Sequence, residues 1–242
     1  MVKIKGNLEG KRVENIGSHN LKRNIYKGLD QVRIGERVLG PQDIFKRNID
    51  DPDALIEGAS VCILGLGGLG SNIGVYLARS GIGKLVLVDF DQVEASNLNR
   101  QYYSLGHIGM KKTQALVEVI RSINPFIDLE TIDTKINRDN IMDIVKGQQI
   151  ICEALDDPVT KSMVVSEVLA NSDDKRVIAA SGMAGLGDAN LIRTQKKFSR
   201  LYICGDERSD FELTPGMMAP RVSICAGHQA NIILRLIMGL EG

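Results

Sequence analysis

Long apolar runs are missing from this sequence. No stretch approaches the roughly 20 uninterrupted apolar residues that a membrane-spanning helix needs, although 43% of the 242 residues are hydrophobic. The first residues, MVKIKGNLEGKRVE, also lack the apolar core of a secretory signal. We therefore expect a cytoplasmic chain with no membrane partner, whose apolar residues form the core of one globular domain with a small appendage.

An excess of charge of either sign is missing as well. Lysine and arginine together number 30, and aspartate and glutamate together number 30. No overall charge draws the chain toward nucleic acid or an acidic membrane, so nucleic acid is not an expected partner. Any anion that the protein binds has to be held by local groups.

Cysteine is scarce, and its spacing gives no metal-binding pattern. The four cysteines, Cys62, Cys152, Cys204 and Cys225, lie far apart and form no CxxC pair. Two of them sit inside apolar runs, VCILG and IICEAL, that are typical of buried strands. The sequence therefore predicts neither a disulfide nor a zinc site.

From Ser60 onward the sequence alternates apolar runs with helix-like segments. The segments are, in order, VCILG, SNIGVYLARSG, KLVLVD, MKKTQALVEVIRSINP, LETID, RDNIMDIVKG, QIICEA, PVTKSMVVSEVLAN and RVIAAS. This alternation predicts an α/β fold with a Rossmann-like, doubly wound and mainly parallel sheet. Two later segments, ANLIRT and SRLYIC, predict an antiparallel C-terminal extension, and SICAGHQANIILRLIMGL predicts a closing helix.

The first part of the chain has a different character. Residues 1–58 show no clean periodicity, contain several glycines and basic residues, and end near the break DDPDA. We interpret residues 1–58 as an N-terminal extension whose structure the pattern does not define. Residues 59–242 are then the domain that carries the function.

A glycine-rich motif follows the first apolar strand of that domain. Gly65, Gly67 and Gly70 satisfy GxGxxG between a strand and a helical segment, with Gly68 inside the motif. Asp89 ends the next apolar run, nineteen residues after Gly70, where a carboxylate can accept hydrogen bonds from both ribose hydroxyls. This pattern predicts nucleotide binding and suits NAD and ATP alike.

Polar residues after Asp89 favour ATP over a dinucleotide. They are Asp91, Asn97, Arg100, Gln101 and Lys112. A parallel sheet would deliver all of them to its carboxyl edge, beside the nucleotide. A dinucleotide's pyrophosphate is held mostly by backbone amides, whereas two added cations suit a free triphosphate. Taken singly, each cation has the alternative interpretation of an ordinary surface residue.

A carboxylate from another strand end completes the predicted site. Asp156 follows the run IICEAL, at a place where a carboxylate just past a buried strand could bind magnesium through one oxygen. The alternative is that Asp156 caps the helix that begins near Pro158. Arg100, Lys112 and Asp156 at one sheet edge nevertheless predict an ATP site with Mg²⁺.

Several of these motifs together resemble the ThiF/MoeB/HesA family of ubiquitin-activating-enzyme-like adenylyltransferases. The resemblance extends from about Ser60 to Gly239 and depends on GLGGLGSN, LVDFDQVEASNLNRQ, IGMKKTQAL, INP and PGMMAPRVSICAGHQAN. It implies that residues 59–242 form a ThiF-type ATP-binding adenylyltransferase domain. The activity implied is ATP-dependent adenylation of the C-terminal glycine of a ubiquitin-like sulfur carrier, giving an acyl-adenylate and pyrophosphate.

The resemblance also implies roles for individual residues. Asp89 would bind the ribose, Asp156 would bind Mg²⁺, and the phosphates would be surrounded by Asn97, Arg100, Gln101 and Lys112. The family forms homodimers in which an arginine before the glycine loop reaches the γ-phosphate of the other subunit. Arg47 is our candidate for that arginine, and Arg33 and Arg37 are the alternatives.

Details of the sequence point to one branch of the family. CEALDD, AASGMAGLGDAN and LYICGDE are similar to the shorter ThiF proteins of thiamine biosynthesis, which implies a ThiS-like carrier with a C-terminal Gly-Gly. Many relatives hold zinc through two CxxC pairs, but only Cys204 remains where the first pair would fall. Cys204 is also the nearest thiol to the loop in which some relatives form a covalent link to the carrier. We interpret it as a buried strand residue.

Three other functions compete with this one. A nicotinamide-dependent oxidoreductase would explain the glycine motif and Asp89 but leaves Arg100, Lys112 and Asp156 without a role. A dehydratase of carbamoylated adenosine in transfer RNA would keep the adenylation chemistry and change the substrate. A non-catalytic subunit would keep only the fold. We assign no chemical role to either His107 or His228, which lack a partner pattern.

Overall fold

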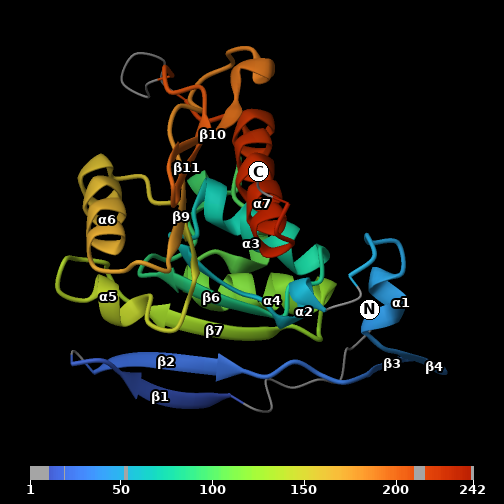
Figure 1. Ribbon diagram of the computed structural model, residues 1–242. Helices are drawn as coiled ribbons and strands as arrows, with labels where there is room; N and C mark the ends of the chain where they lie inside the picture. The colour runs from blue at the N-terminus through green and yellow to red at the C-terminus, as the bar shows by residue number, and fades with distance from the viewer. Residues whose placement is uncertain (1–10, 19, 52–53, 210–215, 241–242) are drawn as a thin grey trace.

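The computed structural model describes residues 11–18, 20–51, 54–209 and 216–240, and it is built on one large sheet (Figure 1). Nine strands follow the order β1-β2-β7-β6-β5-β8-β9-β11-β10, and a separate hairpin pairs β3 with β4. The strands are β1 Arg12–Ile16, β2 Leu21–Tyr26, β3 Val32–Ile34, β4 Arg37–Leu39, β5 Ser60–Leu64, β6 Lys84–Asp89, β7 Asp128–Asp133, β8 Ile150–Glu153, β9 Arg176–Ala180, β10 Arg193–Phe198 and β11 Leu201–Gly205. The helices are α1 Pro41–Phe45, α2 Leu55–Gly58, α3 Gly68–Arg79, α4 Lys112–Ile123, α5 Ile141–Ile144, α6 Pro158–Ala170 and α7 Ala219–Ile237.

The middle of the sheet is parallel. Strands β7, β6, β5, β8, β9 and β11 run in one direction, whereas β1, β2 and β10 run antiparallel to their neighbours at the two edges. The order reverses beside β5, because the chain first moves outward through β6 and β7 and then returns to the other side with β8. In such sheets ligands bind beyond the carboxyl ends of the strands at this switch point. The predicted fold class is confirmed.

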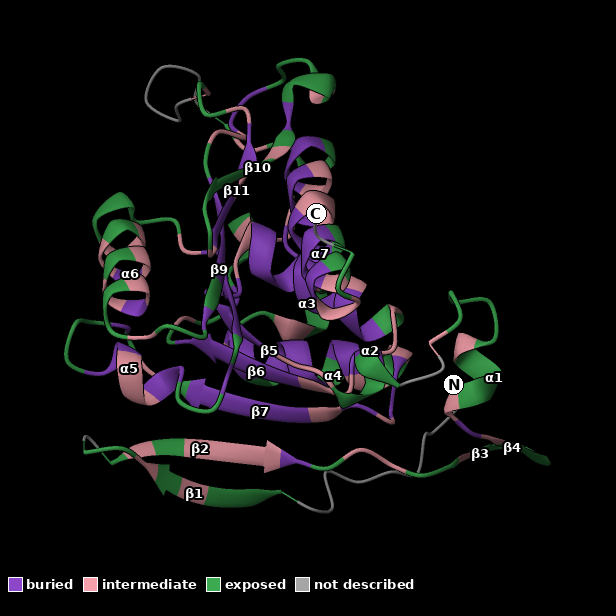
Figure 2. Cartoon of the chain, in the orientation of Figure 1, coloured by how far each residue is buried: buried purple, intermediate pink, exposed green. Residues whose placement is uncertain are grey.

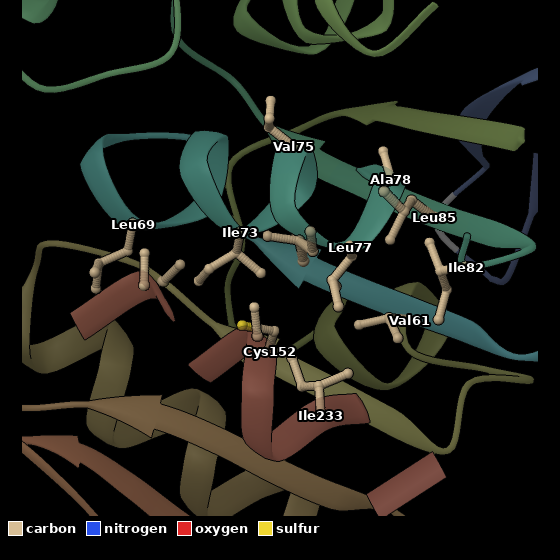
Figure 3. Close-up of a cluster of buried hydrophobic side chains, with 14 of the residues drawn as sticks. Val61, Leu69, Ile73, Val75, Leu77, Ala78, Ile82, Leu85, Cys152 and Ile233 are labelled. Atoms are coloured by element: carbon tan, nitrogen blue, oxygen red, sulfur yellow. The ribbon is translucent and has the colours of Figure 1, made fainter. Parts of the chain in front are cut away.

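Helices cover both faces of the sheet, which explains why the central strands are apolar along their whole length. On β5, Ile63 packs in the cluster of α3, α4 and α7, whereas Cys62 packs in the cluster of α5 and α6. Figure 3 shows the first cluster, with Leu77 of α3 and Ile233 of α7 near Val61. Figure 2 shows the same separation, with buried central strands and an exposed outer side on α6.

Helix boundaries follow local signals in the sequence. Helix α4 ends at Ile123, just before the Asn-Pro pair, because proline disfavours a helical conformation in the residue that precedes it. Helix α6 begins with Pro158, and Asp157 caps it by accepting a hydrogen bond from Thr160 N at 2.7 Å. Proline suits this position because the first amides of a helix have no partner within the helix. RDNIMDIVKG contains only the four-residue helix α5.

The longest helix in the described ranges is α7, with 19 residues. It packs on the sheet beside α3, as Figure 1 shows, and fulfils the predicted closing helix. Neither α7 nor any other helix within those ranges combines the length and the apolar character needed to cross a membrane.

The C-terminal extension differs in one respect from the antiparallel pair that we predicted. Strand β11 runs parallel to β9 and takes the inner position, while β10 forms the edge and is antiparallel to β11. The cause lies in composition. The mostly apolar strand LYICG is largely buried in the inner position, whereas the polar strand RTQKKF is largely exposed at the edge. The ANLIRT segment begins with a 3₁₀ turn at Ala189–Leu191 before β10 starts.

Part of the N-terminal extension joins the main sheet. Strands β1 and β2 form a hairpin, and β2 pairs with β7 along its edge. A buried ion triad lies at this junction: Glu130 of β7 pairs with Arg23 of β2 and, at 2.7 Å, with Lys84 of β6. The Glu130 side chain is only 1% exposed. The boundary at residue 58 stays a prediction.

Candidate nucleotide-binding site

The glycine loop lies between β5 and α3, at the switch point of the sheet. Gly65 has a φ of +88°, a left-handed conformation that favours glycine. A Cβ on Gly65 would lie 2.8 Å from the carbonyl oxygen of Ala154, just past β8, and a Cβ on Gly70 would lie 1.8 Å from the carbonyl oxygen of Gly65. Backbone packing therefore requires glycine at both positions.

Gly67 leaves the N-terminus of α3 open. It is the N-cap residue and supplies no side chain to the amides of the first turn. Among the described residues, a Cβ on Gly67 would meet only Nε2 of Gln101, at 3.8 Å. On the other side, a Cβ on Gly68 would lie 3.1 Å from Cγ1 of Val222 in α7. Free amides and the helix dipole make such an end suitable for phosphate.

Asp89 lies at the carboxyl end of β6 and is tied to the glycine loop. One carboxylate oxygen accepts a hydrogen bond from Leu66 N at 2.7 Å, and the other accepts one from Asp91 N at 2.8 Å. Each carboxylate oxygen has a further lone pair. Asp89 can thus shape the loop and also accept hydrogen bonds from ribose hydroxyls, and the first of these roles is not apparent from the sequence spacing.

The chain that follows Asn97 lies against the glycine loop. Asn97 closes its own turn, since its Oδ1 accepts a hydrogen bond from Glu94 N at 3.1 Å. Three hydrogen bonds connect the next residues to the loop: Asn72 Nδ2 to Arg100 O at 3.0 Å, Tyr102 N to Ser71 Oγ at 3.0 Å, and Tyr103 Oη to Leu66 O at 2.8 Å. Burial, followed by the negative charge of Asp89, raises the pKa of Tyr103 well above its usual range, so this hydroxyl stays a donor. Our sequence analysis missed these anchors.

Arg100 brings a positive charge to the open helix end. Its Cγ and Cδ would lie 3.5 Å from a Cβ on Gly68. Its guanidinium donates to Asn99 Oδ1 at 2.8 Å, and no carboxylate within the described ranges forms an ion pair with it. The adjacent Gln101 is 7% exposed, and its Oε1 has no hydrogen-bond partner among the described residues. A free cation and an unsatisfied buried amide therefore lie beside Gly67 and Gly68.

Lys112 is held at the same edge of the sheet. It begins α4, is 7% exposed, and pairs through Nζ with Asp91 Oδ2 at 2.9 Å. Its backbone amide also donates to Asp91 O at 2.9 Å. Since Asp91 N donates a hydrogen bond to Asp89, this ion pair connects Lys112 to the loop after β6. In this arrangement its charge is balanced by Asp91, whereas Arg100 has no such partner among the residues that the structure describes.

Asp156 lies in the loop after β8, across the switch point from β6. Its neighbour Leu155 approaches the glycine loop, with Cδ2 3.1 Å from where a Cβ on Gly65 would lie. Asp157, not Asp156, caps α6, which leaves the exposed Asp156 carboxylate without a hydrogen bond from any described residue. No group of three or more His, Cys, Asp or Glu within the described ranges could hold a metal ion. The donor set still fits Mg²⁺, which often uses one carboxylate together with substrate phosphates.

Arg47 does not lie in this site within one chain. The next residue, Asn48, donates through Nδ2 to Ser80 O at 3.0 Å, and Ser80 follows the last residue of α3. The glycine loop lies at the other end of that 12-residue helix, about 18 Å away at 1.5 Å per residue. Within one chain, Arg47 is therefore not brought to the glycine loop.

Cys204 of β11 and His228 of α7 both contact Thr194 of β10. Thr194 Oγ1 is 2.9 Å from His228 Nδ1 and 3.6 Å from Cys204 Sγ. Cys204 is nevertheless 0% exposed, and burial raises the pKa of its thiol to about 11. Because a thiolate is the reactive form, this environment favours a packing role for Cys204, as we interpreted it from the sequence.

We expect the thiols of the native chain to resist modification. All four cysteines are buried, so an aromatic disulfide reagent at about pH 8 should label none of them within minutes and all of them in guanidinium. Release of the coloured thiolate measures the labelling. Rapid reaction of one thiol in the folded chain, mapped to Cys204, would contradict the packing role.

The fold and the site together define a nucleotide-binding protein of the Rossmann class. Its distinguishing features are an open helix end at the switch point, an arginine beside it that forms no ion pair within the described part of the chain, and a carboxylate on the far side. The chain belongs to the ThiF family, because residues 45–242 match the model of that family. The predicted family is therefore confirmed.

Individual relatives support this membership. A protein of Saccharomyces cerevisiae strain RM11-1a, "Adenylyltransferase and sulfurtransferase UBA4", is 30% identical over 198 residues, which cover 76% of this chain and 43% of that protein. The tRNA threonylcarbamoyladenosine dehydratase of Haemophilus influenzae is 35% identical over 146 residues, or 59% of this chain and 55% of that protein. This chain thus spans less than two thirds of the length of either relative.

Solved structures share the fold. The tRNA N6-threonylcarbamoyladenosine dehydratase TcdA of E. coli, crystallised with ATP, superposes with a TM-score of 0.74 at 21% identity. The match covers 82% of this chain and 95% of that one. At this identity the likeness concerns the fold alone.

Proposed function

We propose that the chain is an ATP-dependent adenylyltransferase that activates the C-terminal carboxylate of a ubiquitin-like sulfur carrier. The observation that carries the proposal is the unpaired Arg100 beside the open N-terminus of α3. A helix end and a free cation suit a triphosphate better than the pyrophosphate of a dinucleotide. The yeast relative is named as an adenylyltransferase, and TcdA was crystallised with ATP, which also favours ATP over NAD.

Each part of the site has a role in binding ATP. Asp89 accepts hydrogen bonds from the ribose, and the amides around Gly67 and Gly68 receive phosphate oxygens. Arg100 and Lys112 supply positive charge, for which Lys112 has to share its contact with Asp91. Gln101 can bind the nucleotide through its side-chain amide, because its Oε1 makes no hydrogen bond to any described residue. Rotation of the amide exchanges Oε1 and Nε2, so either an acceptor or a donor can face the nucleotide.

The proposed reaction is a displacement at the α-phosphorus. A carboxylate oxygen of the carrier's last glycine forms the new bond, the bond from the α-phosphorus to the bridging oxygen breaks, and pyrophosphate leaves with the electron pair. No general base is needed because the carboxylate is already ionised near neutral pH. The residues of the chain act by position and by charge, since both reactants are anions.

Magnesium enters the proposal through Asp156. Its exposed carboxylate, in the loop after β8, is the group that would hold the ion. When bound there, Mg²⁺ would neutralise charge on the phosphates and stabilise the leaving group. We further propose a homodimer in which Arg47 of one subunit reaches the nucleotide of the other, because that arginine lies far from its own glycine loop.

The carrier is proposed to be ThiS-like, with the reaction serving thiamine biosynthesis. The similarity of CEALDD, AASGMAGLGDAN and LYICGDE to short ThiF proteins supports this choice. We propose that the segment Pro215–Pro220 lies near the path of the carrier's extended tail. Its described part, from Gly216 to Pro220, is held by hydrogen bonds from two other segments. Gly185 N donates to Gly216 O at 2.9 Å, and Asn99 Nδ2 donates to Met217 O at 3.1 Å. The loop segment from Asp210 to Pro215 lies outside the described residues.

Pyrophosphate exchange tests the reaction. The chain is incubated with ATP, Mg²⁺, labelled pyrophosphate and candidate carriers that end in Gly-Gly, and label in ATP is counted. We expect exchange only with the matching carrier. Arg100→Ala should reduce its rate at least about a hundredfold, because a charge that stabilises the transition state is lost.

Asp156→Ala should reduce exchange by at least about tenfold, because the carboxylate that would hold Mg²⁺ is lost. Matched controls are Arg176→Ala and Asp174→Ala, which remove exposed groups at the amino edge of the sheet, opposite the edge that carries the glycine loop. Both should exchange at the wild-type rate, and circular dichroism should show all four variants folded. Full activity of Arg100→Ala or Asp156→Ala would refute the assigned role.

A second candidate function is ATP-dependent dehydration of threonylcarbamoyladenosine in transfer RNA. The observation in its favour is the 35% identity to the Haemophilus influenzae dehydratase. The same assay distinguishes the two, because exchange would then require modified transfer RNA and no carrier. The balance of 30 basic and 30 acidic residues gives this substrate no additional support.

A further inference from the structure

An ion pair between a fully buried carboxylate and a partly buried lysine lies close to Asp156 in the chain. Glu153, the last residue of β8, is 0% exposed, and Lys161 of α6 approaches both of its carboxylate oxygens at 2.8 Å. Burial raises the pKa of Glu153, against the opposing effect of Lys161. Burying such a pair is costly, and two apolar side chains of similar volume would often stabilise a fold equally well. Stability alone therefore gives little reason for charges at these positions.

The pair holds the backbone of one residue from both sides. Leu155 N donates to Glu153 Oε1 at 2.7 Å, and Lys161 Nζ donates to Leu155 O at 2.9 Å. Both hydrogen-bonding groups of the Leu155 backbone are therefore used by the ion pair. Leu155 also lies close to the glycine loop, since its Cδ2 is 3.1 Å from where a Cβ on Gly65 would lie.

The residue after Asp156 is held as firmly. Asp157 caps α6 through Thr160 N at 2.7 Å, and its carbonyl oxygen accepts from Lys161 N at 2.9 Å. Asp156 thus stands between two residues whose positions are set by hydrogen bonds, while its own carboxylate receives none from the described residues. The backbone on both sides of Asp156 is therefore fixed, while its carboxylate can bind a ligand.

We propose that Lys161 and Glu153 are positioning residues for Asp156, acting through the backbone of Leu155 to hold its carboxylate where a divalent cation bound to ATP can be reached. This inference rests on the proposed function. Neither Lys161 nor Glu153 was singled out by the sequence analysis, because a glutamate inside an apolar run and a lysine on a helix eight residues later form no recognised motif.

The test compares binding of ATP with and without Mg²⁺. Lys161→Met and Glu153→Gln are titrated with ATP by calorimetry, once in excess Mg²⁺ and once in a chelator. We expect affinity in Mg²⁺ to fall about 10–100-fold, as for groups that orient a metal ligand, while affinity in the chelator stays within about twofold. Lys161→Arg keeps the positive charge, so its ATP affinity in Mg²⁺ should be close to that of the wild type.

A buried lysine elsewhere serves as the control. Lys175 is 8% exposed and donates to Gln148 O at 2.7 Å, beyond the amino end of β8. Lys175→Met should lower the free energy of unfolding and leave the effect of Mg²⁺ on ATP affinity unchanged. If a single variant at Lys161 or Glu153 fails to fold, the double variant Glu153→Leu/Lys161→Met removes both charges together and is measured instead.

The outcomes separate this inference from the function on which it rests. A wild-type chain that binds no ATP overturns both. If wild-type ATP affinity depends on Mg²⁺ and the Lys161 and Glu153 variants or the double variant show the same dependence, the pair is purely structural and the inference alone is wrong.

Discussion

Alanine at Gly70 is expected to abolish ATP binding and to lower the free energy of unfolding by several kcal/mol. The added Cβ would lie 1.8 Å from the carbonyl oxygen of Gly65, far inside contact distance. Neither atom belongs to a flexible side chain, so the strand end or the first turn of α3 has to move. Movement of either one disrupts the amides that the open helix end presents to phosphate.

Gly74, one turn further along α3, provides the matched control. A Cβ there would lie 3.2 Å from Cδ2 of Leu116, the end of a side chain that can adjust. Alanine also favours a helix over glycine by about 1 kcal/mol, which offsets the closer contact. Gly74→Ala should therefore keep its ATP affinity and remain within about 1 kcal/mol of wild type.

Urea unfolding and ATP titration of both variants give the measurement. Overpacking typically costs about 1–3 kcal/mol where side chains can respond, and the loss for Gly70→Ala should exceed that range because backbone has to respond. If Gly70→Ala bound ATP normally, the close approach of α3 to β5 would not be needed for the site.

The glycine loop shows what sequence spacing could predict. Gly65 and Gly70 are required by contacts between a strand and the helix that follows it directly, so the constraint is local and leaves a local pattern. The neighbourhood of Asp89 was predictable for the same reason, since the carboxyl ends of parallel strands meet at one edge. Periodicity from Ser60 onward likewise predicted the parallel sheet that the structure has.

Contacts between distant segments were not predictable in this way. Lys161 and Glu153 are eight residues apart, yet they meet at the backbone amide and carbonyl of Leu155 in the turn between them. The direction of β11 depends on which strand of a hairpin takes the inner position, and that is decided by tertiary burial. Arg47 could be chosen only by resemblance, and a single chain places it at the far end of α3.

The hairpin of β1 and β2 escaped prediction because its strands, RVENI and LKRNIY, are short and largely polar. Their attachment depends on β7, more than a hundred residues later in the chain. The residues that reveal the attachment are charged: Arg23 and Lys84 meet at Glu130. The glutamate in LETID, Glu130, does not by itself indicate an ion triad, because its two partners lie on other strands.

Arg23→Ala is accordingly expected to destabilise the chain strongly. The Arg23 side chain is 12% exposed and that of Glu130 is 1% exposed, so the substitution leaves a buried carboxylate with Lys84 as its remaining partner. Breaking a buried ion pair from one side costs about 3–5 kcal/mol. The lower end of that range applies because Lys84 stays 2.7 Å from Glu130.

Two further variants identify the cause of that loss. Arg12→Ala removes an exposed partner of Glu14 from the same hairpin, with side chains 77% and 38% exposed, and should cost less than about 1 kcal/mol. The double variant Arg23→Leu/Glu130→Leu removes the buried charge along with its partner, and should recover most of the stability that Arg23→Ala loses. Urea unfolding measures all three. If the double variant is no more stable than Arg23→Ala, the loss comes from packing of the arginine stem, and the uncompensated charge of Glu130 is not its cause.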